Sequence, residues 1–146
     1  MIQSNSPPSS EYYVIFTQGV THWVSCKLKP NFSHVVLITR DEYNWIVLNP
    51  TRLYLQVIIP PVLITDSPLP MFTKPADTVL HITFDKRDDT QQYGAWGLFN
   101  CVTWAKYILG LRILCFTPWR LYNRLLNFKP DDFRKHGIRS IKKVDI

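Results

Sequence analysis

The chain divides into a first part in which short apolar runs alternate with polar turns and a last third with helical spacing. Runs rich in β-branched and aromatic residues, bounded by Gly, Pro, Asn or Asp, are typical of strands. They predict strands at residues 12–17, 21–28, 34–40, 43–49, 52–59 and 78–84. The prolines within residues 60–76 predict a loop, and the polar stretch 85–92 predicts another.

Helical periodicity begins only after these strands. Apolar residues at positions 102, 105, 108 and 109 share one face of a helix that starts at Cys101, and Gly110 offers a stop. Thr117 followed by Pro118 indicates a second helix, because a Thr hydroxyl can cap it and Pro suits its first position. Strands followed by helices predict an α+β fold, with an antiparallel sheet or small barrel from the N-terminal two thirds packed against C-terminal helices.

Length and composition indicate one domain. A chain of 146 residues, of which 46% are hydrophobic and 14% aromatic, can bury a core. No segment recurs at a fixed period, which argues against a solenoid. We expect a flexible arm over residues 1–10, a single domain over residues 11–128 and a basic tail over residues 129–146.

The formal net charge of +6 is concentrated in the C-terminal part. Residues 101–146 hold ten Lys or Arg and three Asp, whereas the first hundred residues hold seven basic and eight acidic ones. Such a region can bind an anionic polymer, a membrane surface or an acidic partner, or can be an ordinary solvated face.

Nothing in the sequence indicates a signal peptide, a membrane span, a metal or a cofactor. The apolar stretch 98–116 is interrupted by Lys106 and Arg112, which a spanning helix would avoid. An odd number of cysteines without close spacing argues against a disulfide framework or a zinc ribbon; they are Cys26, Cys101 and Cys115. We therefore expect a reducing compartment and a cytoplasmic protein.

Cys101 is the best placed of the three thiols for chemistry. It lies at the start of a predicted helix, and the helix N-terminus lowers the pKa of a thiol and favours thiolate. Cys26 in a predicted strand and Cys115 between apolar neighbours are typical of core cysteines.

The predicted strands at residues 34–40 and 43–49 can form a hairpin, and its register indicates which histidine could act as a base for this thiol. If its turn closes so that Arg40 faces Tyr43, His34 lies directly across from Asn49. Opposite side chains have Cβ atoms about 5 Å apart, so the Asn oxygen can accept a hydrogen bond from the imidazole. This is the base and its orienting partner in a Cys-His-Asn triad. An ordinary polar pair, with a cysteine that only packs, would give the same pattern.

The helical part of the chain has a recognisable motif. It consists of Asn100-Cys101-Val102-Thr103-Trp104-Ala105-Lys106, then Ile108-Leu109-Gly110, then Thr117-Pro118-Trp119-Arg120-Leu121-Tyr122. The motif resembles the circularly permuted NlpC-type papain-like proteins, in which an Asn-Cys pair opens a helix and the His strand precedes the Cys. Lecithin retinol acyltransferase relatives share that order, and small phage and bacterial proteins have similar helices. The resemblance spans residues 12–128, with its specific part at the Cys segment.

The resemblance implies a thiol hydrolase or acyltransferase that needs no cofactor. It assigns Cys101 as nucleophile, His34 as general base and Asn49 as the third, orienting residue. It also implies that the Cys101 backbone N–H binds the oxyanion. Gln91, Gln92 and Tyr93 are candidates for a second donor that no motif assigns. The substrate would be a peptide or peptidoglycan-like amide, or a lipid ester. The alternatives are a non-catalytic structural or virion-associated protein with this fold, and a binder of anionic polymer.

The remaining histidines give weaker patterns. His22 and Cys26 lie too far apart along a strand to share a metal. His81 alternates with apolar neighbours and is typical of a sheet residue, while His136 follows two basic residues and reads as surface charge.

Aromatic residues near the C-terminal basic residues allow a second interpretation. Trp119 and Tyr122 alternate with Arg120 and Arg124, an arrangement that can stack bases and bind phosphates. At helical spacing, however, Trp119, Tyr122 and Leu126 form a stripe suited to packing on the sheet.

Overall fold

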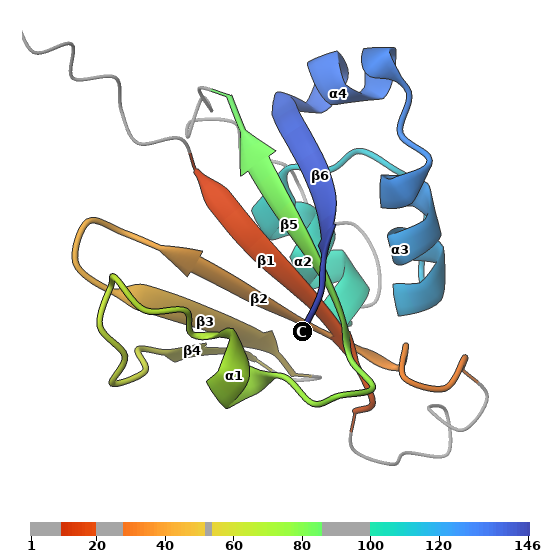
Figure 1. The fold of residues 1–146 in the computed structure, drawn as a ribbon. Helices are drawn as coiled ribbons and strands as arrows, with labels where there is room; N and C mark the ends of the chain where they lie inside the picture. Colours follow the sequence, from red (N-terminus) through yellow and green to blue (C-terminus); the bar gives the residue numbers. More distant parts are fainter. Residues whose placement is uncertain (1–9, 20–27, 52–53, 86–99) are drawn as a thin grey trace, which may run out of the picture.

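A computed structural model describes residues 10–19, 28–51, 54–85 and 100–146 and has an α+β fold. Within these residues six strands form one antiparallel sheet in the order β4-β3-β2-β1-β5-β6. They are β1 (Glu11–Thr17), β2 (His34–Arg40), β3 (Trp45–Pro50), β4 (Leu55–Ile58), β5 (Thr78–Phe84) and β6 (Ile138–Val144). The predicted fold class is confirmed, with a sheet and C-terminal helices packed on it (Figure 1).

The helices lie on both faces of the sheet. They are α1 (Leu69–Phe72), α2 (Cys101–Leu109), α3 (Pro118–Leu126) and α4 (Pro130–His136). Figure 1 shows α2 behind the central strands and α1 in front of β3 and β4. No helix within the described ranges is long and apolar enough to cross a membrane.

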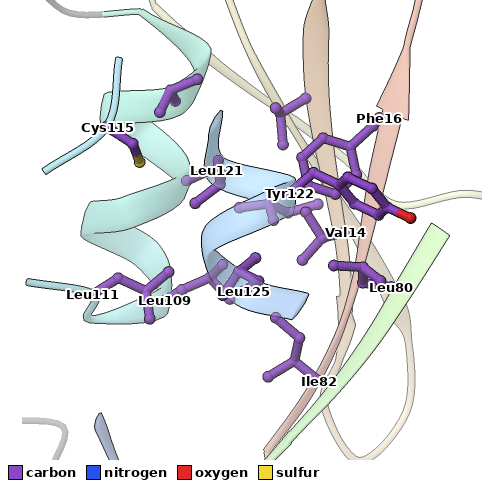
Figure 2. Packing of buried hydrophobic residues seen from close by; sticks show 14 of the residues in the cluster. Val14, Phe16, Leu80, Ile82, Leu109, Leu111, Cys115, Leu121, Tyr122 and Leu125 are labelled. Carbon is purple, nitrogen blue, oxygen red and sulfur yellow. The ribbon is translucent and has the colours of Figure 1, made fainter. Parts of the chain in front are cut away.

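The larger core fills the space between the sheet and helices α2 and α3 (Figure 2). Val14 and Leu80 contribute from the strands, and Leu109, Leu121 and Leu125 from the helices, each at most 1% exposed. Fully burying one such side chain stabilises the fold by about 1.5–3 kcal/mol. A smaller core on the opposite face consists of Ile15, Ile38, Trp45, Val47, Leu69 and Val79.

The ends of the two long helices follow the predicted signals. Gly110 ends α2 in the left-handed conformation, with φ of 65°, and Thr117 caps α3 by accepting from the Arg120 N–H at 3.3 Å. Asn100, a cap that the periodicity did not predict, accepts from the Thr103 N–H at 2.9 Å. The Asn100 cap fixes the start of α2 at Cys101, and Gly110 fixes its end at Leu109.

The β2–β3 hairpin has a register two residues away from the predicted one. Arg40 pairs with Trp45, and not with Tyr43. Asp41 Oδ1 accepts hydrogen bonds from the N–H groups of Tyr43 at 2.7 Å and Asn44 at 2.6 Å, which closes a longer turn. Because side chains alternate with a period of two, this shift leaves each of them on its predicted face.

The segment expected to be a basic tail contains α4 and β6, the last strand of the sheet. Ile141 pairs with Ile82, and Ile138 pairs with Phe84 after a register shift. The shift allows two isoleucines three positions apart to reach the same core face. Such spacing breaks the period of two, which is why the sequence pattern concealed this strand.

The other differences concern loops. Residues 60–76, expected to be a loop, include the single turn α1, and the strand expected at 52–59 is described only from Leu55 to Ile58. The strand expected at residues 21–28 and the loop at 85–92 lie outside the described residues but for Leu28 and Asp85.

Candidate functional site

The predicted pair His34 and Asn49 forms a hydrogen bond across the β2–β3 hairpin. His34 Nε2 lies 2.8 Å from Asn49 Oδ1. When the ladder is continued past the pair Leu37 and Leu48, Asn49 stands opposite Val36, so it reaches His34 diagonally. The expected bond is present, although the pair was expected to be directly opposed.

With the Asn49 amide turned so that Oδ1 faces the ring, this hydrogen bond leaves one nitrogen of His34 to act as a base. An amide oxygen only accepts, so Nε2 of the neutral ring carries the hydrogen. The lone pair then lies on Nδ1. The arrangement therefore leaves Nδ1 to take a proton from another group.

Asn49 is in turn held from the neighbouring strand β4. Its Nδ2 donates to Gln56 Oε1 at 3.1 Å, and the two residues are paired in the β3–β4 ladder. Gln56 was not predicted from the sequence. The register of the next hairpin, closed by the Thr51 N–H bonded to the Tyr54 carbonyl at 2.8 Å, is the signal that could have found it.

The Cys101 thiol lies at the first position of α2, in contact with the larger core. Burial raises its pKa above the ordinary thiol value, and the backbone N–H groups of Val35, Val102 and Cys101 itself oppose this rise. The N–H groups of the helix start do lower the pKa of this thiol, as expected, but the net shift is upward. Loss of water around the sulfur outweighs the N–H groups that face it.

Cys101 and His34 approach the same end of β2. Val35, whose N–H faces the thiol, directly follows His34. Val35 and Leu37 point into the core that also contacts Cys101, so alternation directs His34 to the other face. The described β2–β3 pairing ends at Leu37 and Leu48, which leaves the strands open beside Val35. Among the described residues no hydrogen bond joins the Cys101 thiol and the His34 ring.

His81 and His136 take structural roles. His81 Nε2 lies 2.8 Å from Glu11 Oε2, and its ring stacks on Tyr13 within the sheet, as expected. His136 does more than carry surface charge, because its Nε2 accepts from the Arg112 N–H at 3.2 Å. Across the described part of the chain, no three His, Cys, Asp or Glu side chains gather to hold a metal ion.

Cys115 is buried at 1% exposure, as expected for a core cysteine. His22, Cys26 and the second oxyanion donor sought at residues 91–93 lie outside the described residues.

The aromatic stripe of α3 faces the core. Tyr122 is buried and Trp119 is partly buried against the same cluster, so packing accounts for both rings. Leu126, expected in this stripe, is 46% exposed, and Leu125 takes its place. The geometry of α3 therefore favours packing over base stacking.

Comparison with known proteins adds no identification. No protein-family model, curated protein or solved structure matches the chain significantly. The resemblance to permuted papain-like proteins therefore stays a prediction based on the motif.

Proposed function

We propose that the protein is a cysteine-dependent hydrolase or acyltransferase that cleaves an amide bond of a peptide or peptidoglycan-like substrate, or an ester. The observation that carries the proposal is the 2.8 Å hydrogen bond between His34 Nε2 and Asn49 Oδ1. It orients an imidazole at the end of β2 where the Cys101 thiol faces the N–H of the next residue, Val35. These are the three residues that the motif assigned.

The reaction would begin when His34 Nδ1 takes the thiol proton of Cys101 and the sulfur attacks the carbonyl carbon. The backbone N–H of Cys101, which has no partner within the helix, is the donor that we assign to the oxyanion. His34 then gives the proton to the leaving amine or alcohol, and a thioester remains on Cys101. Water, or a second acceptor, then gives a proton to His34 Nδ1 as its oxygen attacks the thioester carbonyl carbon. The carbon–sulfur bond breaks, the acyl group leaves on that oxygen, and His34 returns the proton to the Cys101 sulfur, which restores the thiol and the neutral ring.

The raised pKa of Cys101 decides how the nucleophile would be formed. Burial keeps the thiol protonated at neutral pH. A preformed thiolate is therefore not the resting state. Proton transfer to His34 must accompany the attack, which makes the reactivity of Cys101 depend on that ring.

Thiol labelling tests the proposal directly. Iodoacetamide at neutral pH should label Cys101 of the full chain faster than Cys26 or Cys115, measured peptide by peptide by mass spectrometry. His34→Ala should slow the labelling of Cys101 by about tenfold or more, in line with the loss of a general base. His81→Ala, a histidine elsewhere in the sheet, should leave the rate unchanged. Equal labelling of the three thiols, or no effect of His34→Ala, would contradict the proposal.

One observation favours a second candidate function. A thiol with a raised pKa is also what a non-catalytic protein with this fold would contain. In that case Cys101 is a packing residue, and the His34–Asn49 bond only ties the hairpin. The same labelling experiment separates the two functions, because a packing cysteine gains nothing from His34.

A further inference from the structure

Three polar side chains form a line across strands β4, β3 and β2. Gln56 Oε1 accepts from Asn49 Nδ2 at 3.1 Å, and Asn49 Oδ1 lies 2.8 Å from His34 Nε2. The line starts at an exposed residue of the edge strand and ends at the imidazole of the proposed site. Because the Gln56 side chain is exposed, packing does not explain its place in this line.

The two ends of the Asn49 amide have opposite effects on the ring. With Oδ1 toward His34, Nε2 carries the hydrogen and Nδ1 holds the lone pair. With Nδ2 toward His34, the ring would have to accept at Nε2, and Nδ1 would carry the hydrogen and could not act as a base. The contact with His34 alone does not choose between these states, since each forms one hydrogen bond.

We propose that Gln56 is a positioning residue that selects the productive tautomer of His34 through Asn49. An acceptor at Gln56 Oε1 holds the Nδ2 end of the amide and so turns Oδ1 toward the ring. This inference rests on the proposed function for its consequence in catalysis. The ratio of the two tautomers of His34 can be measured without any substrate.

Two substitutions separate the acceptor from the bulk of the side chain. Gln56→Met keeps the length of the side chain and removes the acceptor, whereas Gln56→Glu keeps acceptor oxygens. Val57→Ala is the matched control, because Val57 is the next residue of the edge strand, is 58% exposed and points to the opposite face. The tautomer of His34 is read from ring ¹⁵N chemical shifts of the full chain at about pH 8, where an ordinary imidazole is neutral.

The native chain, Gln56→Glu and Val57→Ala should hold the hydrogen on Nε2. Gln56→Met should lower the ratio of this tautomer to the other by about fivefold, the effect of one net hydrogen bond. The iodoacetamide rate at Cys101 should fall with it. An unchanged ratio in Gln56→Met, or an equal loss in Gln56→Glu, would overturn the inference.

The two readouts distinguish failure of this inference from failure of the proposed function. If His34→Ala leaves the labelling of Cys101 unchanged, the proposed function fails, yet the tautomer ratio still reports on Gln56. If His34→Ala slows labelling and Gln56→Met changes neither ratio nor rate, only the inference fails.

Discussion

Gly19 lies in close contact with His34 at the end where β1 and β2 separate. A Cβ atom on Gly19 would stand 3.0 Å from His34 Cβ and 3.5 Å from its Cγ. The Gly19 N–H also donates to Ser33 Oγ at 2.8 Å, which holds the two segments together. Any side chain at Gly19 must therefore push on the imidazole that Asn49 orients.

Gly19→Ala should displace His34 and slow the iodoacetamide labelling of Cys101. Overpacking of this kind costs about 1–3 kcal/mol of stability. Gly137→Ala is the control, because Gly137 has a φ of +65° and nothing within 4 Å of an added Cβ, so its cost is backbone strain alone. A variant of Gly19 that labels as fast as that of Gly137 would show that this contact does not position the ring.

Asn100→Ala should destabilise the protein by about 1 kcal/mol, because it removes the side chain that caps α2. Asn100 Oδ1 accepts from both the backbone N–H and the hydroxyl of Thr103, at 2.9 Å and 3.2 Å. Asn100→Asp keeps the acceptor and should retain most of the stability. Urea unfolding of the three proteins measures the difference, and equal midpoints would contradict a role for the cap.

The sequence predicts best those contacts that depend only on which face of the sheet each side chain occupies. The hydrogen bond between His34 and Asn49 is predicted, although the turn and the directly opposed pairing are not, because a shift of two residues preserves the alternation of a strand. A shift of one residue would have separated them. The turn itself depends on the Asp41 side chain bonding to two N–H groups, which alternation does not reveal.

Two features could not be predicted from the sequence, because they depend on contacts between residues that are distant in the chain. The pKa of Cys101 follows from burial against the sheet, whereas its neighbours in sequence show only a helix start. Likewise, β6 joins the sheet by pairing with β5, with a register shift at Phe84, whereas its basic residues in the sequence are typical of a solvated tail. Lys142 and Lys143 on this edge strand are also the kind of residue that discourages pairing with another chain.

Ile138→Ala tests whether β6 belongs to the domain. Ile138 is 3% exposed within the larger core, so its truncation should cost about 2–5 kcal/mol. Lys143→Ala, on the same strand, should change stability by no more than about 0.5 kcal/mol. Thermal unfolding followed by circular dichroism provides both values. Two small, equal effects would indicate that the segment is a tail.

Stability should fall at alkaline pH because burial raises the pKa of both Cys101 and Cys115. The folded protein then holds these thiol protons more tightly than the unfolded chain does. Below the ordinary thiol pKa, about 8.5, the free energy of unfolding is unaffected; above it, unfolding releases protons and becomes more favourable. The loss continues as the pH rises through the folded values.

Urea unfolding in the presence of a reductant, at several pH values from about 7 to 10, measures this loss against the thiol range. Cys115→Ala removes one of the two thiols, so its free energy of unfolding should start lower at neutral pH and decline less steeply. The neutral-pH cost reports the lost packing of a residue that is 1% exposed, and the change in slope reports the titration alone. If the variant and the native chain declined in parallel, Cys115 would not be a source of the alkaline sensitivity, and the same comparison with Cys101→Ala would then assign it to the thiol beside Val35.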